Sequence, residues 1–243
     1  MIEKAQHEPF LFVTESFIAK TAALYNCIFV CMKPIILIDN GHGSNTPGKC
    51  SPDVTNWKFD SPYVFYEYEW TRQVAHGIVS ILFALGYDAR LLVPETVDIP
   101  LKERVERVNK LCRQYGSKNV LLVSVHNNAA GCTGRWLNAR GWSIYTTKGI
   151  TEADSLAEEI HLVAQQEFKA PLTVRRYSNQ KLGLDYEENF YILVHTYCPA
   201  VLVENFFQDN KEDVAYLKSD EGKGQCMHVI CQGLENYIVK NYK

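Results

Sequence analysis

Residues 34–43 read PIILIDNGHG and place four large aliphatic side chains directly before a polar turn that contains His42. A short apolar run bounded by proline and glycine is typical of a central strand that is buried on both faces of a sheet. Residues 120–129, VLLVSVHNNA, repeat the arrangement, with His126 after the second apolar run. The two stretches therefore predict neighbouring strands, each followed by a histidine at its carboxyl end.

Two interpretations of this histidine pair are open. In the first, each imidazole caps its own turn through a backbone hydrogen bond. In the second, His42 and His126 together supply half of a tetrahedral metal site. The second interpretation fits the general rule that sites in open α/β sheets form beyond the carboxyl ends of the strands.

The composition is that of an ordinary globular chain. Of its 243 residues, 47% are hydrophobic and 22% are charged, which is enough to bury a full core. The formal net charge is −3 and no run of lysine or arginine is present, so we expect no nucleic-acid partner. The eight cysteines form no CxxC pair and no zinc-finger spacing, so we expect reduced thiols and no disulfide framework.

The first 31 residues are predicted to be an extension that the rest of the chain does not need for folding. The stretch 10–32 is apolar, but Glu15 and Lys20 interrupt it, and neither a basic cluster nor a small-residue cleavage site accompanies it. We therefore expect no integral membrane segment and no signal peptide. The folded domain is predicted to span residues 32–243.

Strand-like and helix-like patterns alternate from Lys33 onward, which predicts a single α/β domain with a mostly parallel central sheet covered by helices on both faces. The expected strands are 35–38, 87–93, 120–125, 142–147 and 200–204. The expected helices are 66–85, 101–115, 152–168 and 221–239. In the second of these helices, Arg104, Arg107 and Lys110 are assigned to a solvated face.

The helix expected at residues 66–85 offers a third metal ligand. At about 100° per residue, Glu67 shares the apolar stripe of the helix, whereas Glu69 lies on the polar face. The stripe also contains Val74, Ile78, Ile81, Leu82 and Leu85. A carboxylate on a buried stripe needs a proton, hydrogen bonds or a cation. Glu67 is therefore interpreted as a metal ligand or as a capping group at the helix start, and Glu69 as surface.

Glu204 follows the apolar run 200–203 and is expected at the same edge of the sheet. Two histidines and one carboxylate with an open fourth position describe a catalytic zinc site, which needs a base. Glu204 is the candidate for this base. The alternative is an ordinary glutamate at the surface end of a strand.

Four segments in this order resemble the zinc-dependent N-acetylmuramoyl-L-alanine amidases of the amidase family 3 type. The segments 38–43 and 124–129 resemble the two histidine motifs of that family, 67–75 its helix-opening glutamate motif, and 199–204 its catalytic-glutamate segment. The likeness covers nearly all of residues 33–240. It departs from the family pattern at Tyr68 and Thr71, and residues 49–66 match no motif.

The resemblance implies that His42, Glu67 and His126 bind one Zn²⁺ ion and that Glu204 is catalytic. The implied reaction is hydrolysis of the amide between N-acetylmuramic acid and L-alanine in peptidoglycan, with residues 32–243 as the catalytic domain. Two other functions share these residue types: a zinc peptidase or deacetylase acting on another amide, and a non-catalytic wall-binding protein. The presence of Glu204 argues against the second.

Substrate contacts are predicted for Asn128, in the second histidine segment, and for Arg175 and Arg176, which suit a carboxylate of the stem peptide. A solvated charge pair is the interpretation that the sequence favours for the two arginines. No segment between His126 and Glu204 is a clear blocking helix, so we expect an open cleft that requires no activator.

The expected place of action is the cell wall or periplasm, where peptidoglycan lies. The weak export features of residues 1–31 and the cysteine content both suit an intracellular origin. Release of a phage-type lysin through a membrane lesion reconciles these expectations.

Overall fold

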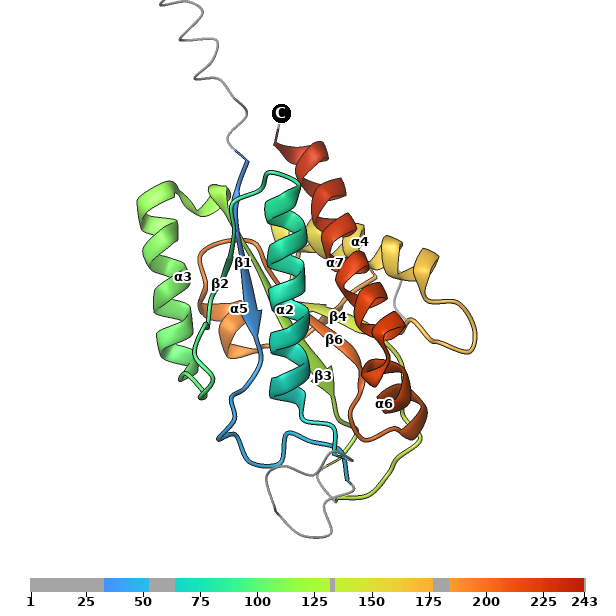
Figure 1. Cartoon of the computed structure of the whole chain (residues 1–243). Helices are drawn as coiled ribbons and strands as arrows, with labels where there is room; N and C mark the ends of the chain where they lie inside the picture. The colour runs from blue at the N-terminus through green and yellow to red at the C-terminus, as the bar shows by residue number, and fades with distance from the viewer. Residues whose placement is uncertain (1–32, 53–63, 132–133, 177–183, 243) are drawn as a thin grey trace, which may run out of the picture. The chain divides into compact units, whose positions relative to one another are not determined.

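A six-stranded sheet forms the centre of the protein, which is described by a computed structural model covering residues 33–52, 64–131, 134–176 and 184–242. The strands are β1 (Ile35–Asn40), β2 (Ala89–Leu91), β3 (Val120–Asn128), β4 (Ser143–Thr146), β5 (Tyr186–Glu187) and β6 (Ala200–Phe207). The helices are α2 (Glu67–Ala84), α3 (Leu101–Tyr115), α4 (Glu152–Glu167), α5 (Tyr191–His195), α6 (Lys211–Lys218) and α7 (Asp220–Asn241), with a 3-10 turn at Ser117–Asn119. Figure 1 shows their arrangement. The predictions for residues 1–31 lie outside the described residues, as do residues 53–63 of the segment that matches no motif.

The strand order is β2-β1-β3-β6-β4-β5, and only the pairing of β4 with β6 is antiparallel among the described strands. The predicted mostly parallel sheet is confirmed. From β1 the chain first adds β2 on one side and then β3 on the other. This change of direction makes the carboxyl ends of β1 and β3 the topological switch point, where α/β sheets bind their ligands.

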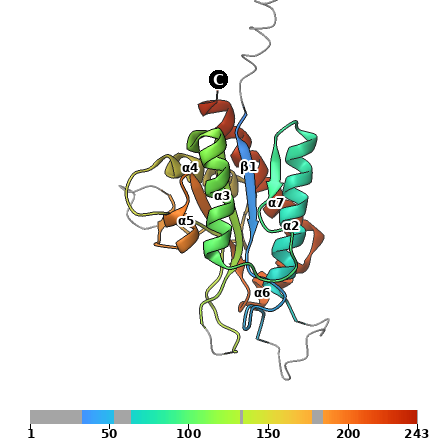
Figure 2. The same ribbon diagram turned by 90° about the vertical axis from the view of Figure 1, so that its left-hand side faces the viewer.

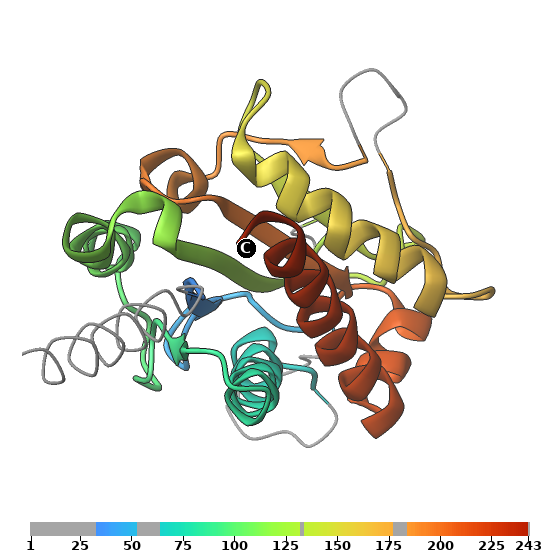
Figure 3. The same ribbon diagram turned by 90° about the horizontal axis from the view of Figure 1, so that it is seen from above.

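Both faces of the sheet are covered by helices, as the sequence predicts. Side chains alternate along each strand, so Ile36 and Ile38 pack toward α2, α4 and α7, whereas Ile35 and Leu37 pack toward α3 and α5. The views in Figures 2 and 3 show α3 and α5 on one face and α2, α4 and α7 on the opposite face. Each strand of the centre is therefore buried on both sides.

Local sequence signals set most of the predicted boundaries. α3 begins directly after Pro100, as expected, and Thr151 caps α4 by accepting a hydrogen bond from the amide of Ala153 at 3.2 Å. β5, α5 and α6 were not predicted, because each is too short to show a clear periodicity. Within the described residues, no helix is long and apolar enough to cross a membrane.

The stripe predicted for α2 is partly wrong. Val74, Ile78 and Leu82 are fully buried, but Ile81 and Leu85 are 39% and 46% exposed. Leu85 follows the last helical residue, so the angular spacing of the helix no longer determines its direction.

Close packing between α4 and α7 depends on a glycine. A Cβ atom added at Gly233 in α7 would lie 2.5 Å from the Cα atom of Ile160 in α4, which is far inside van der Waals contact. Gly224, in the same helix, has no atom within 4 Å of the corresponding position. Of these two residues, Gly233 is therefore required by the contact between α4 and α7, and Gly224 is not.

We expect Gly233→Ala to destabilise the protein by about 1–3 kcal/mol, because α7 must move away from α4. The control Gly224→Ala is expected to stabilise it by roughly 0.5–1 kcal/mol through helix propensity. Urea denaturation followed by circular dichroism measures both changes. Equal effects of the two substitutions would contradict this account of the helix contact.

Candidate metal centre

The turn after β1 directs His42 toward β3. The amide of Gly41 donates to the carbonyl of Val125 at 3.0 Å, and His42 then adopts a left-handed backbone conformation with φ 62°. This region is unfavourable for most residues that carry a side chain, although histidine occurs there more often than most. A Cβ atom at position 41 would lie 2.3 Å from Cε1 of His126, so glycine is required for the two histidines to approach.

His126 and Glu204 lie side by side on one face of the sheet. They are register partners in the parallel pair of β3 and β6, and their side chains point to the face covered by α3 and α5. Glu67 is the first residue of α2, which packs on the opposite face. It reaches the same point because α2 begins at the carboxyl edge of the sheet.

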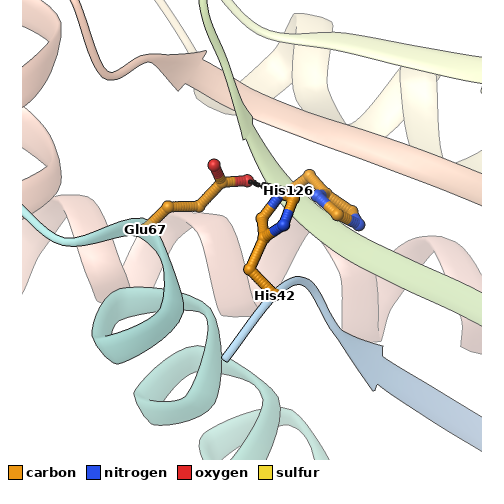
Figure 4. Close-up of side chains that lie close together, drawn as sticks. All are labelled: His42, Glu67 and His126. Carbon is orange, nitrogen blue, oxygen red and sulfur yellow. Dashed lines mark hydrogen bonds and ion pairs between the residues drawn. The ribbon is translucent and has the colours of Figure 1, made fainter. Parts of the chain in front are cut away.

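Three potential ligand atoms converge at this edge, as Figure 4 shows. Oε1 of Glu67 lies 3.4 Å from Nε2 of His42 and 3.1 Å from Nδ1 of His126, and the two imidazole rings are nearly perpendicular at 88°. All three ligand atoms lie within 4.8 Å of one another. Two nitrogens and one carboxylate oxygen at this spacing fit a single metal ion with a position left for water or substrate.

The carboxyl of Glu67 is 1% exposed and ionised. Burial alone would raise its pKa, but hydrogen bonds and charge interactions with His126 and His42 outweigh burial and lower the pKa. For His42, burial is the larger effect and lowers the pKa, whereas for His126 the contacts with Glu67 outweigh burial and raise it. The cluster therefore favours a negative carboxylate that attracts positive charge.

Two further donors hold the Glu67 carboxylate in place. The backbone amide of Asn127 donates to Oε1 at 3.0 Å, and Nε2 of Gln208 donates to Oε2 at 3.2 Å. Gln208 is 2% exposed and is not among the residues predicted from the sequence. No periodic pattern marks a buried glutamine at this position.

A bulge in β6 precedes Gln208. His126 of β3 pairs with Glu204 of β6, and Asn128 of β3 pairs with Phe207 of β6. Two residues of β6 therefore lie between these pairs where β3 has one. Phe206 takes up the irregularity with a left-handed φ of 61°. The regular alternation of side chains along β6 therefore ends after Glu204, and the strand continues to Phe207, beyond the predicted end at residue 204.

Glu204 carries the second acidic group of the site. Its Oε2 atom is buried and has no hydrogen-bond partner among the described residues. Burial raises the pKa of Glu204 to about 8, with a smaller contribution from the charge of Glu67. A nearby dication would act in the opposite direction and favour the ionised carboxylate. The orphaned oxygen and the raised pKa are properties of a group poised to exchange a proton.

A cavity of about 330 Å³ opens beside these groups and is lined by His42, His126 and Glu204. The cavity is also lined by apolar side chains next to and at the start of α3 and α5, which are Ile99, Pro100, Leu101, Phe190, Tyr191 and Ile192. Charged side chains complete the lining, including Lys49, Asp98 and Arg104. A reacting group in this cavity would therefore meet two of the potential metal ligands, Glu204, and both apolar and charged side chains.

The prediction that Arg104 lies on a solvated face is wrong. Arg104 is 2% exposed, and its guanidinium donates to Oδ1 of Asp39 at 2.7 Å and to Oδ1 of Asp98 at 2.8 Å. Oδ2 of Asp39 also accepts from the hydroxyl of Ser124 at 2.6 Å, which ties β1 to β3. The buried pair with Asp39 offsets the cost of removing the guanidinium from water.

Two arginines also hold the strained turn. The carbonyl of His42 accepts hydrogen bonds from Arg72 at 3.1 Å and from Arg104 at 3.3 Å. The hydroxyl of Thr71 donates to the carbonyl of Gly41 at 3.1 Å. These contacts from α2 and α3 stabilise the left-handed conformation that directs the imidazole of His42.

The other predicted site residues lie outside the walls of the cavity. Glu69 is exposed, as the helical spacing predicts. Asn128 is half-buried, with Nδ2 at 3.5 Å from the hydroxyl of Tyr145, and the guanidinium of Arg175 lies 5.0 Å from the ring centre of Phe207. Arg176 is exposed. Substrate contacts by Asn128, Arg175 and Arg176 remain predictions.

Comparisons with known proteins agree with this geometry. Residues 36–236 match the Amidase_3 family, N-acetylmuramoyl-L-alanine amidase. The chain is 26% identical over 238 residues to the N-acetylmuramoyl-L-alanine amidase AmiC of Neisseria meningitidis, covering 85% of this chain and 53% of AmiC. It is 24% identical over 189 residues to the endolysin of Bacillus phage SPP1, covering 78% and 60%. The chain thus spans only 53% to 60% of the length of these relatives.

The fold is also that of a solved amidase. The structure of an N-acetylmuramoyl-L-alanine amidase from Clostridium difficile 630 superposes with a TM-score of 0.67 at 24% identity, over 86% of this chain and 98% of the other. At this level of identity, the likeness supports the fold.

We expect Arg104→Met to lower the free energy of unfolding by about 3–5 kcal/mol, because it leaves the buried Asp39 carboxylate without its partner. Arg107→Met, on the same helix, removes ion pairs of the partly exposed Arg107 with Glu95 and Glu103 and should cost at most about 1 kcal/mol. Chemical denaturation of the two variants tests the difference. A cost below that of Arg107→Met would show that the buried pair contributes little to stability.

Proposed function

Because the chain belongs to the Amidase_3 family of N-acetylmuramoyl-L-alanine amidases, we propose that it hydrolyses the amide bond between N-acetylmuramic acid and the first L-alanine of the peptidoglycan stem peptide. The observation that carries the proposal is the convergence of His42, Glu67 and His126, two of which line one cavity together with Glu204. Each of the four residues comes from a different segment of the chain, and their donor types suit a metal-assisted hydrolase.

The metal in this proposal is one Zn²⁺ ion, held by His42, Glu67 and His126. Two imidazole nitrogens and one carboxylate oxygen are a common ligand set of catalytic zinc sites. When bound, zinc polarises a carbonyl group and lowers the pKa of water. The buried, negative carboxylate of Glu67 supports this assignment, because a cation offsets its desolvation.

Glu204 is assigned the proton transfers. Its carboxylate takes a proton from the water molecule whose oxygen attacks the carbonyl carbon of the lactyl group. The same proton is then donated to the amide nitrogen as the carbon–nitrogen bond breaks. The products are a carboxylate on the muramic acid and a stem peptide with a free L-alanine amine. Apolar side chains at the start of α3 and α5 line the same cavity.

The proposed substrate, peptidoglycan, determines where the protein acts. We propose that the protein acts at the cell wall or in the periplasm, without an activating partner. Release through a membrane lesion, as for a phage lysin, is the route that this proposal favours. Finding the protein outside healthy, intact cells would contradict that route.

We expect Glu204→Gln to retain the metal and to lower the turnover of peptidoglycan by about 10²–10⁴-fold, because the amide cannot accept the proton. Edman or mass-spectrometric detection of new L-alanine amino termini measures the reaction. It also separates an amidase from a peptidase, which leaves alanine on the muramic acid. Glu69→Gln, on the exposed face of α2, is the matched control and should retain full activity.

Removal of the metal tests whether the proposed reaction requires zinc. A chelator should abolish release of stem peptides, and stoichiometric Zn²⁺ should restore it. Full activity in Glu204→Gln, or full activity of the metal-free protein, would refute the assigned mechanism.

Gln208→Met should weaken Zn²⁺ binding by roughly tenfold or more, because it removes the donor that fixes the second oxygen of Glu67. Competition with a chromogenic chelator measures the affinity without any substrate. Gln73→Met, an exposed position in α2, serves as control and should bind zinc like the unmodified protein. Equal affinities of the two variants would exclude a role of Gln208 in holding Glu67.

A further inference from the structure

We propose that Lys49 binds a carboxylate of the stem peptide and so makes the enzyme selective for substrates that carry this charge close to the scissile amide. The inference rests on the proposed amidase function and adds to it a feature of substrate recognition. Lys49 belongs to the segment 49–66, which matches no motif of the family.

Lys49 lies in the wall of the same cavity as His42, His126 and Glu204. Its backbone is fixed, since the carbonyl of Lys49 accepts a hydrogen bond from the amide of Glu67 at 3.1 Å. The next residue, Cys50, forms a β-bridge with Tyr66, directly before α2. The start of the lysine side chain is therefore anchored next to the proposed metal ligands.

Lys49 is half-buried in the wall of this cavity. A positive charge in a partly buried position gains more from an anionic partner than a fully exposed one does.

Within the described part of the chain, no carboxylate lies within the 4.0 Å ion-pair distance of Lys49. The other cation in the cavity wall, Arg104, differs in this respect, because Asp39 and Asp98 bind its guanidinium at 2.7 and 2.8 Å. Among the described residues, Lys49 thus provides a positive charge without an acidic partner beside the proposed site of hydrolysis. A negative group on the substrate would complete the pair.

The chemistry of the proposed substrate identifies that group. The sugar, its acetamido group and the lactyl amide are neutral, and the alanine is joined through both of its backbone groups. The negative charge closest to the scissile bond on the peptide side is the α-carboxylate of the second stem residue, a D-glutamate joined through its side chain. When this carboxylate is amidated, the charge is lost while the shape is kept.

The experiment compares two peptidoglycan preparations that differ only in this group, one with the free carboxylate and one with the amide. We expect the unmodified protein to show a kcat/KM for the free acid that is roughly tenfold higher, mainly through KM, as one charge-assisted contact provides. Lys49→Met should bring the ratio of the two kcat/KM values to about one, and Lys49→Arg should retain the preference. Lys110→Met, on the exposed face of α3, is the control and should leave the ratio unchanged.

Three outcomes would overturn the inference. The first is an equal kcat/KM of the unmodified protein for both preparations. The second is a higher kcat/KM for the amidated preparation. A preference for the acid that persists in Lys49→Met would assign the selectivity to another residue. Failure to release stem peptides from either preparation would instead refute the proposed amidase function itself.

Discussion

The buried carboxylate of Glu67 is the constraint on which the rest of the site depends. At 1% exposure an ionised carboxylate has lost its hydration, so it requires donors or a cation. His42, His126, the amide of Asn127 and the side chain of Gln208 surround it, and they come from three separate strands or turns. The convergence that satisfies this carboxylate is the same convergence that creates a metal site.

A second buried charge supports the first histidine. Arg104 in α3 binds Asp39 and the carbonyl of His42, although no side chain of α3 belongs to the ligand set. α2 reaches the same turn from the opposite face of the sheet, through Arg72. The doubly wound topology therefore matters for function, because helices on both faces fix one strained turn at the switch point between β1 and β3.

Local periodicity was sufficient to predict five of the six strands of the described sheet, the long helices and the buried position of Glu67. The same rules failed for Arg104 and Gln208, because a polar residue in a periodic pattern is assigned to solvent unless its partner is known. The partner of Arg104 is Asp39, 65 positions earlier in the chain, and that of Gln208 is Glu67, 141 positions earlier. The cost of burying such groups is offset only by contacts that the fold brings together.

The sequence by itself determined the order of the elements other than β5, α5 and α6. It also determined the family and the four residues proposed for metal binding and catalysis, since each of the four follows a short local signal at a strand end or a helix start. Only the tertiary structure decided which polar groups hold these residues in place and that Lys49 faces the cavity without an acidic partner in the described chain. The physical reason is that burial of charge depends on partners distant in sequence, whereas burial of apolar side chains follows the repeat of the helix or strand.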